Sequence, residues 1–396
     1  MFEREINPSN ITEADIAVGL ASYQEADTIS FPTIQADEGL KKYFSDLKPV
    51  IINCDNCSPD GTEQAFLNTA TKVPKIYITT PPDTPGKGYN FENMFRKASE
   101  LGVKILICVD ADLESITPEW IKYMGEAIRS GYDYATPIYS RHKYDGTITN
   151  NICYPLVYGL AGKKIRQPIG GDFSLSNRFF EHVTKQMWHR TTKEYGIDIF
   201  LSLNAIFGGF NICEIGLGAK IHKPSAPKLG PMFFQVVSTA FHMIIKNIHQ
   251  LKNVTHIQEC PLFGLRKMDP AQDLNVDRNA ILNKAEEEYA KTSADLKTFL
   301  PVDIFLEIEN IFKTKDMNKL DATLWTKTIY HMITAFAKAD DKAKVVEALR
   351  SLYFARVVSF MNQTWEMSSD EAEIFIIEQA ETFFKNRQYL LDLLAK

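Results

Sequence analysis

The sequence predicts an α/β fold with a largely parallel sheet, followed by an all-helical C-terminal region. In the first half of the chain, short runs rich in β-branched residues alternate with segments that have the apolar spacing of helices. The strand runs are almost continuously apolar, as in sheets that helices cover on both faces. After about residue 225 only the helical pattern continues, so we place two domains at residues 1–225 and 226–396.

Strands and helices alternate in the first domain. The expected strands are 15–23, 49–55, 75–80, 104–112 and 132–140, and the expected helices are 38–47, 61–70 and 88–101. Because ligands bind beyond the carboxyl ends of the strands in such sheets, the polar residues there form the candidate site. In the second domain, apolar stripes predict helices over 324–336 and 345–360. A capping box at Ser368 and Glu371 then opens a last helix that runs toward Leu394.

The composition argues against several classes of protein. The net charge of -6 disfavours a general electrostatic grip on nucleic acid. The amino terminus lacks the apolar segment of a signal peptide, and the most apolar later window, 236–245, is shorter than the ~20 residues of a membrane span. We expect a cytoplasmic protein without an integral membrane segment, and its helical region offers a surface for a homodimer.

Polar clusters follow the first two expected strands. One contains Gln24 and Glu25, and the other runs from Asp55 to Thr62 within the stretch NCDNCSPDGT. Cys54 and Cys57 lack the second pair of nearby ligands that a structural zinc site needs, so we interpret them as reduced thiols. The stretch from Asp55 to Thr62 is expected to form a turn that starts a helix. At the mouth of a parallel sheet, Asp55 is also suited to accept a hydrogen bond from a nucleotide base.

Two further clusters suit phosphate and a cation. Lys87 stands between two glycines, a pattern that favours phosphate but is equally typical of a surface turn. Asp110 and Asp112 end a buried strand, and because strand side chains alternate, both carboxylates point to the same side. Carboxylates beside a phosphate site suit Mg²⁺ or Mn²⁺, whereas a pair of helix-capping aspartates is the alternative.

The order of these motifs resembles that of GT-A (Rossmann-like) nucleotide-sugar glycosyltransferases. The 55–62 stretch is similar to the D-D-x-S-x-D-G-T motif of the mostly inverting family that includes cellulose and chitin synthases. A closer resemblance is to mannosylglycerate synthase and glucosyl-3-phosphoglycerate synthase, both retaining enzymes. It rests on PGKG at 85–88, DAD at 110–112, QPIGGD at 167–172, YGID at 195–198 and AKIH at 219–222. The segment RHKYDGTIT at 141–149 is similar to the acceptor-binding segment of mannosylglycerate synthase.

This resemblance implies a donor site with a divalent metal. Asp112 and His222 would hold the metal, and Asp110 would touch the metal or the ribose. Lys87 would face the diphosphate and stabilise its developing charge. The remaining residues implied at the nucleotide sugar are Gln24, Glu25 and Asp55 around the nucleoside, and Gly170, Gly171 and Asp172 at the hexose.

The resemblance also implies an acceptor site. Its residues would be Arg141, Asp145, Thr149, Tyr195 and Asp198. An arginine fork matches a carboxylate, so an acceptor such as glycerate is physically sensible, although a basic surface turn would also explain residues 141–143. The chain departs from the family at Asp172, where Glu is usual, and at Tyr195, where mannosylglycerate synthase has Trp. Both differences bear on which hexose and acceptor fit.

The expected reaction is transfer of a hexose from GDP-mannose, GDP-glucose or UDP-glucose to a small hydroxy acid such as D-glycerate, with retention and a divalent metal. An inverting glycosyltransferase acting on a glycan or lipid-linked acceptor is one alternative, in which Asp198 or Asp172 would serve as general base. A sugar nucleotidyltransferase is another, but the sequence 19–22 does not resemble its G-x-G-T-R-L motif. A non-catalytic sugar-binding protein is disfavoured by the intact Asp110-x-Asp112 pair.

Overall fold

The computed structural model describes residues 2–223, 229–264, 269, 271 and 273–395, which group into two compact units. Unit 1 comprises Met1–Ser140, Ile169–Ala226 and Cys260–Gln272, and unit 2 comprises Arg141–Pro168, Pro227–Glu259 and Asp273–Lys396. This division differs from the single boundary expected at residue 225, because the segment Arg141–Pro168 groups with the C-terminal helices.

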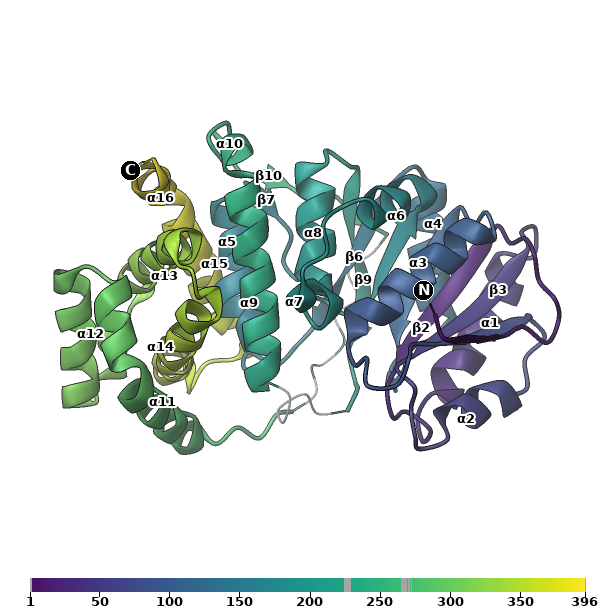
Figure 1. Ribbon diagram of the computed structural model, residues 1–396, viewed down its shortest axis with the longest axis horizontal. Coiled ribbons are helices and arrows are strands. Elements are labelled where there is room, and N and C mark those ends of the chain that lie inside the picture. Colours follow the sequence, from purple (N-terminus) through teal and green to yellow (C-terminus); the bar gives the residue numbers. More distant parts are fainter. Residues whose placement is uncertain (1, 224–228, 265–268, 270, 272, 396) are drawn as a thin grey trace. The chain divides into compact units, whose positions relative to one another are not determined.

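Unit 1 is built on a nine-stranded sheet among its described residues (Figure 1). In spatial order the strands are β1 (Arg4–Ile6), β4 (Lys75–Thr79), β3 (Pro49–Asp55), β2 (Ile16–Ser22), β5 (Ile105–Asp110), β8 (Phe173–Ser176), β6 (Tyr134–Ser140), β9 (Ile212–Ala219) and β11 (Leu262–Phe263). Strands β1 and β8 run antiparallel to their neighbours, and the other pairs are parallel. The largely parallel sheet predicted from the sequence is confirmed.

The register brings the ends of the central strands to one edge. Ser22 at the end of β2 pairs with Asp55 at the end of β3, and Ala21 pairs with Asp110 at the end of β5. The carboxyl ends of these parallel strands therefore meet, as the sequence argument required.

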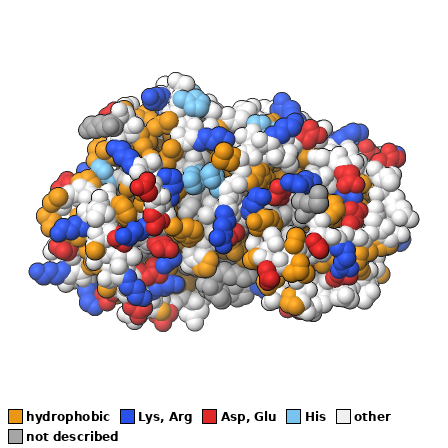
Figure 2. Space-filling view, in the orientation of Figure 1, with side chains coloured by type: hydrophobic (Ala, Val, Ile, Leu, Met, Phe, Trp, Pro, Cys, Tyr) orange, Lys and Arg blue, Asp and Glu red, His pale blue; other side chains and the backbone are white. Residues whose placement is uncertain are grey.

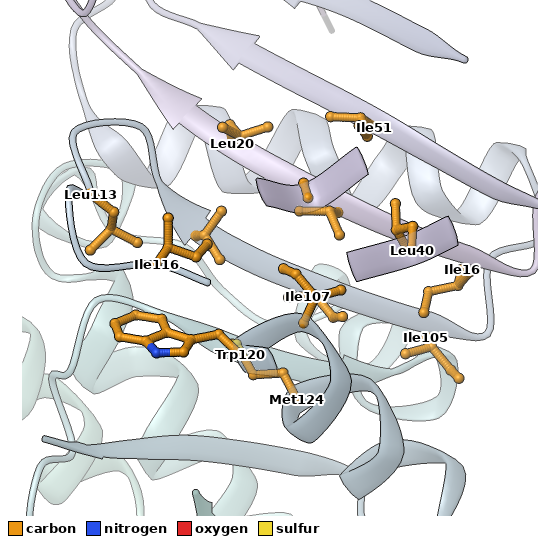
Figure 3. Close-up of a cluster of buried hydrophobic side chains, with 14 of the residues drawn as sticks. Ile16, Leu20, Leu40, Ile51, Ile105, Ile107, Leu113, Ile116, Trp120 and Met124 are labelled. Carbon is orange, nitrogen blue, oxygen red and sulfur yellow. The ribbon is translucent and has the colours of Figure 1, made fainter. Parts of the chain in front are cut away.

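Helices cover both faces of this sheet. They are α1 (Ser30–Tyr43), α2 (Thr62–Asn68), α3 (Lys87–Glu100), α4 (Pro118–Arg129), α6 (Asn177–Thr184), α7 (Arg190–Lys193) and α8 (Ile197–Phe207). Helices α1 and α4 pack on one face, where Ile16 and Leu20 of β2 meet Leu40 and Trp120 in the hydrophobic core (Figure 3). Gly19, which points to the opposite face because strand side chains alternate, lies against Met94 of α3.

Unit 2 is mainly helical. Its elements are η1 (Thr149–Cys153, one turn of π-helix), α5 (Tyr154–Gly159), β7 (Lys163–Lys164), α9 (Leu229–Lys246), α10 (Ile248–Leu251), β10 (Gln258–Glu259), α11 (Arg278–Phe299), α12 (Val302–Thr314), η3 (Met317–Lys319), α13 (Ala322–Lys338), α14 (Lys342–Thr364), α15 (Ser369–Lys385) and α16 (Arg387–Leu394). Strands β7 and β10 pair with each other.

The C-terminal prediction is confirmed with two differences. The capping box at Ser368 and Glu371 is present and opens α15. However, α15 ends at Lys385 and α16 follows, so the last helix does not continue unbroken toward Leu394. The region after residue 225 also contains the short strands β10 and β11, which its helical pattern did not predict.

The surface of the described residues is mixed in character. Acidic and basic side chains are interspersed over the visible face, as expected from the modest net charge of -6 (Figure 2). Within the part of the chain that the structure describes, no helix combines the length and the apolar composition that a membrane span requires.

Candidate active site

Lysines and aspartates gather at the carboxyl edge of the unit 1 sheet. They come from the start of α3, the end of β5 and the turn that follows it, the segment before β8, the first turn of α8 and the residue after β9. The members of this site cluster are Lys87, Asp110, Asp112, Asp172, Asp198 and Lys220. The structure thus brings together five residues that the sequence singled out and adds Lys220.

Lys87 links two of the aspartates. Its Nζ lies 2.8 Å from Asp110 Oδ1 and 3.4 Å from Asp198 Oδ1, and it donates a hydrogen bond of 3.0 Å to the Gly171 carbonyl. Burial lowers the pKa of the ammonium, but the nearby carboxylates outweigh burial, so the pKa lies above its ordinary value. Lys87 is therefore a fixed positive charge at this edge.

Lys220 occupies the other side of Asp110. The Lys220 side chain is only 3% exposed. Its Nζ lies 2.9 Å from Asp110 Oδ2 and 2.7 Å from Asp172 Oδ2, and it donates a hydrogen bond of 3.0 Å to the Gly170 carbonyl. Asp172 is fully buried and also accepts from Tyr139 Oη at 2.6 Å and from the Asp110 amide at 2.9 Å. Burial raises the pKa of Asp110, but Lys220 and Lys87 outweigh it and hold that pKa well below its usual range.

Gly86 and Gly88, on either side of Lys87, allow close packing of the backbone. A Cβ on Gly88 would lie 2.1 Å from the Thr192 carbonyl oxygen, and a Cβ on Gly86 would lie 2.4 Å from the Lys193 carbonyl oxygen. The Gly88 amide donates to the Glu194 carbonyl at 3.0 Å. In this structure the two glycines allow a close approach to α7 and to Glu194, the residue that follows it. It fixes the position from which Lys87 projects.

Asp112 differs from the other carboxylates of the cluster in its contacts. Its carboxylate makes no hydrogen bond or ion pair with any residue that the structure describes, whereas the other carboxylates of the cluster have lysine partners. Burial, and next the Asp110 carboxylate, raise the pKa of Asp112 to about 6. The neighbouring carboxylates of Asp110 and Asp112 fit a divalent cation, because a hard cation prefers oxygen ligands.

The third predicted metal ligand, His222, has a defined ring orientation. Its Nδ1 lies 2.7 Å from the Lys223 carbonyl oxygen, so Nδ1 donates and the lone pair of a neutral ring is on Nε2. Lys223 pairs with Glu25 and Asp27, each at 2.7 Å. Among the described residues no three His, Cys, Asp or Glu side chains converge as a metal site, so the set Asp110, Asp112 and His222 stays a prediction.

The predicted nucleoside residues lie in two interlocked loops. The Gln24 amide donates to Ser58 Oγ at 2.8 Å, and the Glu25 amide donates to Thr62 Oγ1 at 2.9 Å. Gln24 is exposed and has a positive φ of 59°, which is uncommon for a residue other than glycine. The S-P-D-G-T stretch is therefore the expected turn before α2, and it also holds the loop that follows β2.

Asp55 organises this pair of loops. Its side chain is fully buried and accepts hydrogen bonds from Ser22 Oγ, the Ser58 amide and Oγ, and Tyr77 Oη, at 2.7 to 3.0 Å. A base N–H would have to replace one of these donors. Contacts of Gln24, Glu25 and Asp55 with a nucleoside remain predictions.

The predicted acceptor residues fall in both units. Tyr195 and Asp198 belong to unit 1, and burial raises the pKa of Asp198 although Lys87 opposes this. Arg141, Asp145 and Thr149 belong to unit 2. Arg141 Nη1 lies 3.4 Å from Asp145 Oδ2, and Thr149 begins the π-helical turn η1, a feature that is frequent at functional sites.

These three unit 2 residues line a shallow hollow that is open to solvent. Its lining also includes His142, Lys143, Gly146, Asn150, Arg166, Gln167, Ser369, Glu373 and Ile376. The C-terminal helices hold the backbone of η1 here, since Trp325 Nε1 donates to the Asn151 carbonyl at 2.8 Å and Gln379 Nε2 donates to the Asn150 carbonyl at 2.9 Å.

Residues 80–224 match the family model described as "Mannosylglycerate synthase, GT domain". The match contains every member of the site cluster. It confirms the predicted resemblance and the enzyme class, a glycosyltransferase that uses a nucleotide sugar. Together with the sheet, it also confirms the GT-A type of fold. No curated protein matches the chain.

Solved structures of glucosyl-3-phosphoglycerate synthase from Mycobacterium tuberculosis are similar to this chain. Its complex with phosphoglyceric acid has 22% identity and a TM-score of 0.48, covering 58% of this chain and 80% of that one. Its complex with Mn²⁺, UDP-glucose and phosphoglyceric acid has 21% identity and a TM-score of 0.47, covering 58% and 79%.

Sequence reasoning missed several residues of these sites. Lys220 was present in the AKIH stretch, but nothing in the sequence indicates that a lysine after a strand is buried against two carboxylates. Asn56 was likewise overlooked, although its side chain accepts from the Gly86 amide and donates to the Thr84 carbonyl, so it holds the loop before Lys87. Arg166 and Glu373, 207 residues apart, have no shared sequence signal.

Proposed function

We propose that this glycosyltransferase moves a hexose from a nucleotide diphosphate sugar to the hydroxyl of a small hydroxy acid such as D-glycerate. The observation that supports it most is the site cluster, in which two lysines flank Asp110 beside Asp112. A buried positive charge and adjacent carboxylates are what a diphosphate and its divalent cation require. The candidate donors are GDP-mannose, GDP-glucose and UDP-glucose.

In the proposed site, Asp110, Asp112 and His222 hold Mg²⁺ or Mn²⁺. When bound, the cation supplies positive charge that stabilises the leaving diphosphate. Lys87 binds the diphosphate and stabilises the same charge. Gly170, Gly171 and Asp172 are the proposed hexose residues, and Lys220 and Tyr139 orient the buried Asp172.

The proposed acceptor residues are Arg141, Asp145 and Thr149, with Tyr195 and Asp198. The Arg141 guanidinium suits the carboxylate of a hydroxy acid. With retention, the acceptor hydroxyl attacks from the face of the leaving group, and a diphosphate oxygen takes its proton. No protein base is needed on this route.

One observation favours inversion as a second candidate. Burial raises the pKa of Asp198, so this carboxylate is suited to take a proton from an acceptor hydroxyl. The configuration at the anomeric carbon separates the two routes. We expect the product to keep the configuration of the donor, and an inverted product would assign the base role to Asp198 or Asp172.

The proposal is tested by incubating the protein with each donor, Mg²⁺ or Mn²⁺ and a panel of hydroxy acids. We expect release of nucleoside diphosphate that depends on both metal and acceptor, together with a glycosylated acid whose configuration NMR reports. Release of pyrophosphate would point to nucleotidyl transfer instead. The absence of turnover with every donor and acceptor would refute the proposal.

A further inference from the structure

The loop that leads into Lys87 is rich in proline. It runs from Pro81 to Gly86, between β4 and α3, and three of its six residues are prolines, which have no N–H group to donate. Lys87 follows as the first residue of α3. The position of this lysine therefore depends strongly on the groups that anchor the loop from outside.

The side chain of Asn56, directly after β3, is one such anchor. Its Oδ1 accepts from the Gly86 amide at 3.3 Å, and its Nδ2 donates to the Thr84 carbonyl at 3.2 Å. A donor thus faces the amide oxygen and an acceptor faces the amide nitrogen, so the two backbone groups together require an amide. A carboxylate at position 56 would still accept from Gly86, but it would place an oxygen against the Thr84 carbonyl.

Asn90, in the first turn of α3, holds the Asn56 side chain in place. Its Nδ2 donates to Asn56 Oδ1 at 3.1 Å and to the Ser22 carbonyl at 3.0 Å. The backbone amide of Asn56 donates to the same Ser22 carbonyl at 3.1 Å. Both asparagines are buried, with exposed fractions of 6% for Asn56 and 1% for Asn90. Their hydrogen bonds are shielded from water and tie the start of α3 to the ends of β2 and β3.

The preceding residue, Asp55, holds a different part of the proposed donor site. Its carboxylate accepts from the Ser58 amide and hydroxyl, each at 2.7 Å, and Ser58 Oγ accepts from the Gln24 amide. Two consecutive residues at the end of β3 therefore have separate tasks. Asp55 organises the loops predicted to surround the nucleoside, whereas the Asn56 side chain holds the loop that leads to Lys87.

We infer that Asn56 is a positioning residue whose side-chain amide sets Lys87 for the diphosphate of the donor. The inference rests on the proposed function, in which Lys87 binds that diphosphate. On its other side the loop is held by the packing of Gly86 and Gly88 against α7 and Glu194. Loss of the Asn56 amide frees one side of the loop, so the ammonium is no longer fixed where the diphosphate binds, while the bonds of Asp55 stay in place.

The test measures, by calorimetry with Mg²⁺ present, the binding of GDP, UDP and the nucleosides guanosine and uridine. The variant Asn56→Asp keeps an acceptor for the Gly86 amide and loses the donor to the Thr84 carbonyl. We expect its affinity for whichever diphosphate the wild-type protein binds to fall about tenfold. Its affinity for the corresponding nucleoside should stay the same, because only the diphosphate meets Lys87.

Asn204→Asp is the matched control. Asn204 is also a buried asparagine of unit 1, and its Nδ2 donates to a backbone carbonyl, that of Phe200, at 2.8 Å within α8. This variant removes the same kind of bond at a distance from the loop, so both affinities should equal those of the wild-type protein. A tenfold loss of diphosphate affinity in the control as well would overturn the inference.

A double-mutant cycle shows whether Asn56 acts through Lys87. In a Lys87→Met background, Asn56→Asp should lower the diphosphate affinity no further, because the group that Asn56 positions is already absent. A further tenfold loss in that background would overturn the inference, as would an equal loss of nucleoside affinity in Asn56→Asp alone. Asn56→Ala, which buries no carboxylate, carries the same expectations if Asn56→Asp does not fold.

Failure of the proposed function gives a different result from failure of the inference. Wild-type protein that binds neither GDP nor UDP would remove both proposals. Unchanged diphosphate affinity in Lys87→Met would take Lys87 out of the diphosphate site, and the inference with it. Diphosphate binding that weakens in Lys87→Met but not in Asn56→Asp or Asn56→Ala would remove the inference alone.

Discussion

Replacing Lys220 with Met should destabilise unit 1 strongly, because it removes a buried ammonium and leaves its acceptors in place. Lys220 Nζ donates to Asp110 Oδ2, Asp172 Oδ2 and the Gly170 carbonyl within 3.0 Å. The methionine side chain is similar in length but offers these oxygens no hydrogen bond or charge. Asp172, whose side chain is 0% exposed, has no access to water that could compensate.

The size of the effect follows from the burial of the pair. Removing one partner of a buried ion pair typically costs about 3 to 5 kcal/mol. Asp172 keeps its hydrogen bonds from Tyr139 Oη and the Asp110 amide, and Asp110 keeps Lys87, so we expect the lower end, about 3 kcal/mol. Against the 5 to 15 kcal/mol of a typical unfolding free energy, a loss of about 3 kcal/mol is a large fraction.

Urea unfolding measures this loss, with tryptophan fluorescence as the signal. Trp120 reports on unit 1, since its ring lies 5.4 Å from that of Tyr139 in the core beneath the site. With a urea dependence of about 2 kcal/mol per molar, the midpoint should fall by roughly 1.5 M. The control is Lys48→Met, which breaks a pair with Glu13 whose side chains are 63% and 70% exposed, and it should barely move the midpoint. Equal midpoints for the two variants would refute the reasoning.

Three further predictions concern the same unit. Asp112→Ala should abolish turnover and metal-dependent donor binding, measured by calorimetry, while circular dichroism stays unchanged; near-normal activity would contradict the metal assignment. Gly171→Ala should lower the unfolding free energy by at least about 1 to 2 kcal/mol, because φ is 93° and the added Cβ would lie 2.6 Å from Asp110 Oδ2 and from Lys220 Nζ; an unchanged urea midpoint would argue against this crowding. Cys57→Ser should keep transfer activity near the wild-type level, since this thiol is exposed and makes no disulfide; a loss of activity would assign the thiol a role.

The parallel strands could be predicted closely because strands that are buried on both faces are almost continuously apolar in sequence. The run 49–55 became β3 without any shift, and 104–112 contains β5. Strand β8, by contrast, was missed. Its four residues follow the GGD stretch directly, and their place between β5 and β6 depends on pairing with strands that are far away in the sequence.

The residues of the candidate site also fall into those that local sequence predicts and those that only the tertiary fold brings together. Lys87, Asp110 and Asp112 were found because they follow strands or lie between glycines, which is local information. Lys220 was missed because an isolated lysine is normally exposed, and only the tertiary fold buries it between Asp110 and Asp172. The grouping of 141–168 with the C-terminal helices was also out of reach, since it depends on packing such as that of Gly159 against Phe383.

The path of the chain between the two units limits how the protein can be cut. Residues 141–168 belong to unit 2, yet unit 1 precedes and follows them. A fragment that ends near residue 225 would keep this segment but lose its partners, such as α15, which packs against α5. Ile152 and Val157, fully buried in the whole chain, would then lose their helical covering and favour aggregation. Neither unit can be expressed as one uninterrupted piece, so a boundary chosen from sequence alone would yield an incomplete fold.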